Sequence, residues 1–255
     1  MKRAIALGLL SFLVVVVSCT HLATPNDLPT DGVASFADWC RHQDSWSPET
    51  QHTIALLLEQ AETQQCGRAA RRLTRLTRLD LWDRGVTDVT PLASLTHLTE
   101  LVLWGHEIAD VTPLARLTNL TELVLGANRI VDISPLADLT RLTELHLYEN
   151  QIVDVSPLAS LTHLTELSIG DNHIADVASL ANLTNLTWLS LDSNQITDVA
   201  PLANLTNLAE LYLTSNQIAD VKPLAGLTSL TVLSLVNNPL GDRTCPLQPE
   251  TICRF

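Results

Sequence analysis

Leucines recur along most of this chain at a fixed interval, and the interval predicts the architecture. A leucine opens each of eight segments that follow one another every 22 residues, from Leu76 to Leu230. Within a segment the pattern is LxxLxLxxNxIxDVxPLxxLTx, so positions 4 and 6 are apolar and alternate with variable positions. Alternate residues of a strand share a face, so each segment is expected to form a short strand with its leucines inward. One segment cannot bury these leucines alone, and the segments must therefore stack.

The repeat resembles the leucine-rich repeat in its short bacterial form, as found in internalins. This resemblance implies an α/β solenoid with a parallel β-sheet on the concave face and short 3-10 turns on the convex side. The asparagine at position 9 of six copies resembles the family's asparagine ladder, whose amides bond buried loop backbone. The aspartate at position 13, for example Asp110, is expected to cap the 3-10 turn, which explains this row better than a functional role does.

Different sequence flanks the repeats, which occupy residues 76–238 with the last copy incomplete. Residues 36–75 are predicted to be a helical N-terminal cap, with Ser47 as N-cap and Pro48 at the first helical position. Residues 239–255 are predicted to cover the other open end of the solenoid. The basic stretch from Arg68 is interpreted as the junction of cap and solenoid, with contact to anionic lipid as the alternative.

Four cysteines lie outside the repeats, one pair on each side. In an exported chain an even number favours disulfides, and the sequence-local pairing of Cys40 with Cys66 and of Cys245 with Cys253 is the simplest of three arrangements. Zinc is the competing use of cysteines, but the spacings of 26 and 8 residues match no CxxC-type site. We therefore expect two disulfide bonds that stabilise the caps.

Residues 1–18 are predicted to be an export signal, since Lys2 and Arg3 precede an apolar run too short to span a bilayer. The end of this segment, VVSC, resembles the lipobox of bacterial lipoproteins. That resemblance implies that Cys19 is acylated and that the lipid is the only contact with the membrane. Residues 19–35 have few bulky apolar side chains and contain two prolines and a glycine, so they are interpreted as a tether. The lipobox resemblance places the protein in the bacterial cell envelope, with the outer membrane favoured because Thr20 follows Cys19. An ordinary signal peptide cut nearby is the alternative.

Composition and motifs argue against several classes of function. The net charge is −13, with 28 acidic against 15 basic residues, which disfavours nucleic-acid binding because phosphates require clustered Lys and Arg. No GxSxG, P-loop or Rossmann glycine pattern occurs, and no nucleophile lies near a base in the repeat pattern. We therefore predict no enzyme and no cofactor, and the scattered histidines predict no metal site.

Positions 3, 5 and 7 of each repeat flank the inward leucines, so they are expected to form the solvent side of the concave face. Five of the seven Trp and Tyr residues fall there: Trp82, Trp104, Tyr148, Trp188 and Tyr212. Exposed Trp and Tyr side chains are common anchors of interfaces, which predicts a binding role. The alternative is that each ring suits a strand and packs on its neighbour.

Position 3 also holds a column of glutamates: Glu100, Glu122, Glu144, Glu166 and Glu210. Like charges on neighbouring strands destabilise a sheet, so either a basic ligand compensates them or duplication has retained them. His106, which replaces a ladder asparagine beside Trp104, and His146 complete the candidate binding residues. We predict a protein or peptide partner on the concave face, at its N-terminal end first, the alternative being a structural lipoprotein docked in an envelope complex.

Overall fold

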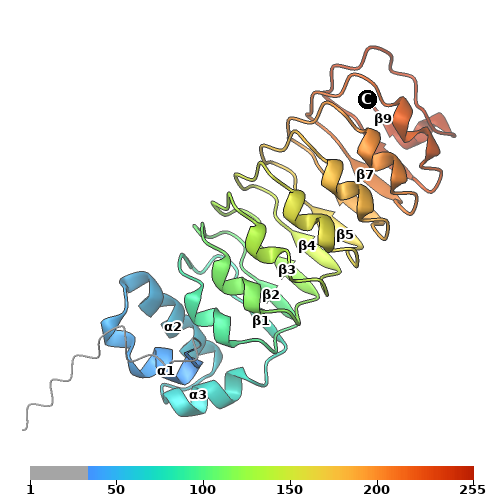
Figure 1. Cartoon of the computed structure of the whole chain (residues 1–255). Helices are drawn as coiled ribbons and strands as arrows, with labels where there is room; N and C mark the ends of the chain where they lie inside the picture. Colours follow the sequence, from blue (N-terminus) through green and yellow to red (C-terminus); the bar gives the residue numbers. More distant parts are fainter. Residues whose placement is uncertain (1–33) are drawn as a thin grey trace, which may run out of the picture.

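The computed structural model describes residues 34–255, so the predicted signal peptide and Cys19 lie outside the described residues. The chain forms a stack of similar coils with helices at one end and the C-terminus at the other (Figure 1). Among residues 34–255, no helix is both long enough and apolar enough to cross a bilayer.

Nine parallel strands form one sheet, and they follow one another in chain order. They are β1 (Arg78–Asp80), β2 (Glu100–Val102), β3 (Glu122–Val124), β4 (Glu144–His146), β5 (Glu166–Ser168), β6 (Trp188–Ser190), β7 (Glu210–Tyr212), β8 (Val232–Ser234) and β9 (Cys253–Arg254). From β1 to β8 each residue pairs with the equivalent residue of the next repeat, as Leu101 does with Leu123. The predicted solenoid is thus confirmed, and the strands include the repeat positions that were expected to form them.

A 3-10 helix lies on the return side of each coil, as predicted. These are η3 (Thr90–Ser94), η4 (Thr112–Arg116), η5 (Ser134–Leu136), η6 (Ser156–Ser160), η7 (Ala178–Asn182), η8 (Ala200–Asn204) and η9 (Lys222–Gly226). The aspartate before each accepts a hydrogen bond from the first backbone N–H of the turn, for example Asp110 Oδ1 from Thr112 at 2.8 Å. Each aspartate at position 13 therefore caps the 3-10 turn that follows it.

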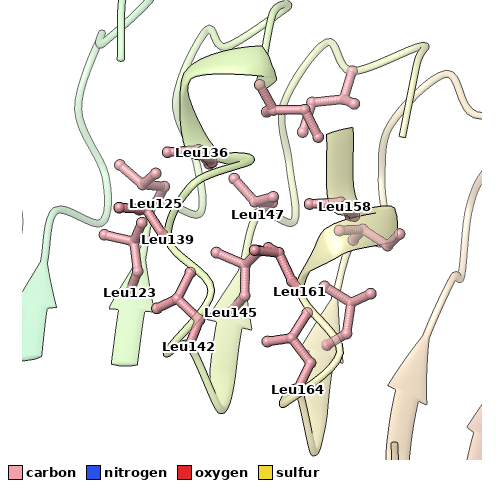
Figure 2. Packing of buried hydrophobic residues seen from close by; sticks show 14 of the residues in the cluster. Leu123, Leu125, Leu136, Leu139, Leu142, Leu145, Leu147, Leu158, Leu161 and Leu164 are labelled. Atoms are coloured by element: carbon pink, nitrogen blue, oxygen red, sulfur yellow. The ribbon is translucent and has the colours of Figure 1, made fainter. Parts of the chain in front are cut away.

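The core lies between the sheet and the 3-10 helices. Leu123, Leu145 and Leu147 from the strands meet Leu136 and Leu158 from the return segments (Figure 2), and all five are fully buried. Because every leucine contacts side chains of the neighbouring coils, the repeats stabilise one another.

The N-terminal cap contains three helices, where one was predicted by pattern. They are α1 (Phe36–Arg41), α2 (Pro48–Gln60) and α3 (Cys66–Leu73), with a short 3-10 helix, η2 (Gln43–Ser45), after α1. Ser47 caps α2 as expected, accepting from the Thr50 N–H. Ile54 and Leu57 of α2 and Leu73 of α3 are buried in the same core as the first repeats.

Each cap contains one disulfide bond. Cys40 of α1 is bonded to Cys66 of α3, and Cys245 is bonded to Cys253. The C-terminal cap does more than cover the core, because β9 pairs with β8 and adds a strand that the repeat pattern does not contain. A further 3-10 helix, η10 (Glu250–Ile252), leads into it.

Candidate functional site

The concave face consists of the outward side chains at positions 3, 5 and 7 of the repeats. On β4, for example, Leu145 is fully buried, whereas Glu144 and His146 on either side are half-buried and lie on the solvent side. The strict one-to-one register carries this alternation along eight strands, which at about 4.8 Å per strand spans roughly 35 Å. The predicted face therefore exists, and its side chains form aligned rows.

Three of the predicted aromatic residues form a cluster at the N-terminal end of this face. Trp82 stacks on Trp104, with ring centroids 4.2 Å apart and planes inclined by 27°. On the other side of Trp104, Gly126 has no side chain, and a Cβ there would lie 2.7 Å from the Tyr148 ring and 3.0 Å from Trp104 Cδ1. The glycine thus leaves the space into which Tyr148 and Trp104 lean. We call Trp82, Trp104 and Tyr148 the aromatic cluster.

Packing explains part of this cluster but not all of it. Trp104 and Tyr148 are half-buried by their neighbours, as the packing alternative requires. Trp82 is 54% exposed, although it is the largest type of side chain and stacks on one face only. The Trp104 Nε1 atom is buried and has no hydrogen-bond partner among the described residues, which is unusual for an indole N–H. Burial also raises the pKa of Tyr148, so this phenol stays neutral.

The other two aromatic residues form a separate pair. Trp188 and Tyr212 lie on β6 and β7 with ring centroids 5.6 Å apart and planes inclined by 46°. The Tyr212 hydroxyl donates to Glu210 Oε2 at 2.5 Å, and this bond raises the pKa of Tyr212. The five predicted residues are therefore brought together as a cluster of three and a pair of two, separated by β5.

The predicted column of glutamates runs along the strands of the aromatic cluster from β2 to β5, and it continues on β7 after Trp188. Arg78 donates to Glu100 at 2.8 Å, and Glu210 accepts from Tyr212, so both ends of the column have partners. Glu122, Glu144 and Glu166 are in direct register on β3, β4 and β5, and within residues 34–255 their carboxylates form no ion pair or hydrogen bond. Burial raises the pKa of Glu144, and the charges of Glu166 and Glu122 raise it further.

One histidine lies within this column. His146 is two residues after Glu144 on β4, and one ligand atom from each of Glu144, His146 and Glu166 lies within 4.8 Å of the others. The histidines are scattered along the sequence, which predicts no metal site, whereas the fold brings residues from adjacent repeats together. The signal available in the sequence was the only histidine at position 5, flanked by glutamates two residues before it and twenty residues after it.

His106 is a correction to the predicted binding residues. It is 6% exposed, and its Nδ1 accepts from the Val86 N–H at 3.2 Å. In the next coil, Asn128 Oδ1 accepts from the Ile108 N–H in the same way at 3.1 Å. His106 thus supplies the acceptor of a ladder asparagine and points into the fold instead of toward a ligand. Burial lowers the pKa of His106, which keeps the imidazole neutral.

The other departure from the ladder, Arg84, contacts the cap. Its guanidinium lies 2.6 Å from a carboxylate oxygen of Glu59 on α2, and its backbone carbonyl accepts from His52 Nε2 at 2.7 Å. The first ladder position therefore holds the helical cap on the solenoid. Both departures therefore have structural partners within residues 34–255.

Comparisons with known proteins agree with the repeat fold. A family profile described as leucine rich repeats (2 copies) matches residues 118–160, 140–182, 184–226 and 206–244. A comparison with curated proteins gave no match. Among solved structures, internalin C2 of Listeria monocytogenes is 37% identical with a TM-score of 0.67, and the match covers 72% of this chain and 80% of that one. The chain belongs to the internalin-like leucine-rich-repeat family.

Two further structures place this leucine-rich-repeat protein among its relatives. The internalin inlF of Listeria monocytogenes is 35% identical with a TM-score of 0.71, and the match covers 77% of this chain but only 60% of that one. The repeat ectodomain of the Arabidopsis thaliana receptor kinase GASSHO1/SCHENGEN3, solved in complex with CASPARIAN STRIP INTEGRITY FACTOR 2, is 28% identical with a TM-score of 0.57. That match covers 63% of this chain and 21% of the ectodomain. Leucine-rich repeats commonly mediate protein–protein binding and are generally not enzymes.

Proposed function

We propose that this leucine-rich-repeat protein is exported, anchored by lipid at Cys19, and binds a basic protein or peptide segment across its concave face. The observation that carries the proposal is the pairing of exposed aromatic surface with unneutralised carboxylates on one face. Neither feature is needed by the solenoid, whose stability comes from the leucines and the ladder. Aromatic anchors and complementary charge are the usual means of recognising an extended partner.

The arrangement of the face favours an elongated ligand. The Trp188–Tyr212 pair lies farther along the sheet than the aromatic cluster, and Glu122, Glu144 and Glu166 occupy the three strands before Trp188. A chain lying across the strands could place apolar side chains on the two aromatic groups and Lys or Arg on the glutamates. The plant receptor ectodomain in complex with its factor is a precedent for ligand binding by the same fold.

A capture experiment tests this function. The core and both caps lie within residues 36–255, so the protein lacking residues 1–33 retains every buried side chain. Replacing Trp82, Trp104, Tyr148, Trp188 and Tyr212 by Ala should reduce partner recovery from surface extracts at least about 10-fold, because anchor residues each contribute about 2 kcal/mol or more. Trp82→Ala alone should give part of this loss, since it removes the most exposed ring of the aromatic cluster together with its stacking on Trp104.

The matched control replaces exposed apolar side chains elsewhere. Val131 and Val153 are 55% and 57% exposed and lie outside the concave face. Their change to Ala should leave recovery unaltered. Release of the partner by salt would support a basic ligand, since screening weakens exposed charge pairs. Equal capture by the five-residue variant and the wild type would show that the concave face is not the binding surface.

Lipid anchoring is tested separately. The four cysteines within residues 34–255 are bonded in two pairs, which makes Cys19 the odd cysteine of the five in the chain. Cys19→Ala should abolish acylation, measured by mass spectrometry of the full chain recovered from membranes. Processing at the same place without any lipid on the wild type would support the ordinary signal peptide instead.

A further inference from the structure

Three potential metal ligands converge at the middle of the concave face. Glu144 and His146 are alternate residues of β4, so the pleat turns both to the same side. Glu166 on β5 is the register partner of Glu144. One ligand atom from each of the three residues lies within 4.8 Å of the others, without any rearrangement of the backbone.

These groups have no other partner within residues 34–255. No hydrogen bond or ion pair joins the side chains of Glu144, His146 or Glu166 to a described residue, although all three are half-buried. Elsewhere on the face, Glu100 is neutralised by Arg78 and Glu210 is bonded to Tyr212. The place where carboxylates crowd without compensation is therefore also the place where an imidazole nitrogen is added.

From this arrangement we propose that Glu144, His146 and Glu166 bind a first-row divalent cation of the Zn²⁺ class. Imidazole nitrogen favours Zn²⁺ over Mg²⁺ and Ca²⁺, which prefer shells of oxygen alone. Zn²⁺ accepts three protein ligands and keeps its remaining positions for water or another group. Two carboxylates balance its double charge and thereby relieve the repulsion along the column. The proposal does not depend on the proposed partner, because the three ligands belong to this chain.

The sheet holds the three ligand residues at fixed spacing and leaves them accessible from solvent. All three ligands project from strands whose leucines are fully buried, so the spacing of their Cα atoms is set by the sheet. The open coordination positions point to the solvent side of the concave face. A cation bound there would neutralise Glu144 and Glu166 beside Tyr148 of the aromatic cluster, and it would compete with a basic partner for these two carboxylates.

Calorimetric titration of the untagged protein, residues 34–255, with ZnCl₂ tests the site. We expect saturable binding of one Zn²⁺ per chain that excess Mg²⁺ or Ca²⁺ does not displace. Each of Glu144→Gln, His146→Gln and Glu166→Gln should weaken binding by roughly 10-fold or more, since even residues that only orient a ligand have effects of that size. Glu122→Gln is the matched control, because it removes the same charge from the same column, and its effect should stay under about fivefold.

A second measurement keeps the test independent of how well the variants fold. Histidine-ring NMR of the wild type should show one imidazole shifting on addition of Zn²⁺, and that signal should be absent from His146→Gln. Binding that Glu122→Gln weakens as much as the ligand variants would mean diffuse attraction and would overturn the site. Absence of saturable binding, or a shift confined to other histidines, would also overturn it.

Discussion

Asn150→Ala is expected to destabilise the protein by about 3 kcal/mol, because a buried ladder asparagine satisfies backbone groups of two neighbouring coils. Asn150 is 7% exposed, and its Oδ1 accepts from the Ile130 N–H at 3.0 Å. Its Nδ2 donates to the carbonyls of Leu125 at 3.0 Å, Leu147 at 3.0 Å and Tyr148 at 3.2 Å. Alanine would leave the buried Ile130 N–H without a partner, whereas the carbonyls of Leu125, Leu147 and Tyr148 would each lose one of two hydrogen bonds and keep those from Asn128, Asn172 and the Ala127 N–H. The free energy of unfolding from urea titration measures the loss.

Asn207→Ala is the matched control for this prediction. Asn207 also donates one hydrogen bond to backbone, from Nδ2 to the Thr184 carbonyl at 2.8 Å, but it lies on the exposed surface. Water can replace that bond, so the expected loss is within about 0.5 kcal/mol. Similar losses for Asn150→Ala and Asn207→Ala would contradict the view that burial makes the ladder important.

The strands, the ladder and the turn caps could be predicted because each role recurs at one place in every repeat. Leu101 and Leu123 occupy equivalent positions, and a stack of coils gives them equivalent surroundings. A periodic sequence thus determines the environment of each position without knowledge of distant contacts. The caps lack this advantage. The strand β9 depends on pairing with β8, and α3 has no apolar pattern apart from the leucine and alanines that contact the core.

The residues that lie on the concave face could be predicted for the same reason, but the contacts among their side chains could not. Register places Trp82, Trp104 and Tyr148 in one row, yet their contact depends on ring rotamers and on the missing side chain of Gly126. The convergence of His146 with Glu144 and Glu166 likewise depends on how side chains lean across the sheet. The repeat pattern predicts which residues lie in the same row of the concave face, whereas side-chain packing determines which of these residues are in contact.

His106 shows how a departure from the repeat can mislead. A histidine among six asparagines suggests a changed surface, especially beside Trp104. However, the fold already buries this position, and an imidazole nitrogen can accept the bond that an amide oxygen normally accepts. A departure at a buried position is therefore better interpreted first as a structural substitute. Departures at outward positions, such as His146 on β4, are the more informative ones.

Removal of the Cys40–Cys66 bond is expected to destabilise the protein by about 3.5 kcal/mol, against about 2.5 kcal/mol for Cys245–Cys253. The bonds close loops with sequence separations of 26 and 8 residues, and a longer loop loses more chain entropy in the unfolded state. The Cys40→Ala/Cys66→Ala and Cys245→Ala/Cys253→Ala double variants avoid free thiols, and urea unfolding gives both free energies.

The position of the first bond adds a local effect to the global one. It ties α1 to α3, and Phe36, Ile54 and Leu73 of this cap are buried against the first repeats. Without the bond, amide hydrogen exchange should accelerate in α1 well before it does in β4, because the cap is held to the solenoid at the end of the stack. In the C-terminal variant the acceleration should instead appear at β8 and β9. If a reducing agent left the unfolding of the wild type unchanged, the disulfides would not contribute to stability in solution, and both expected losses would be wrong.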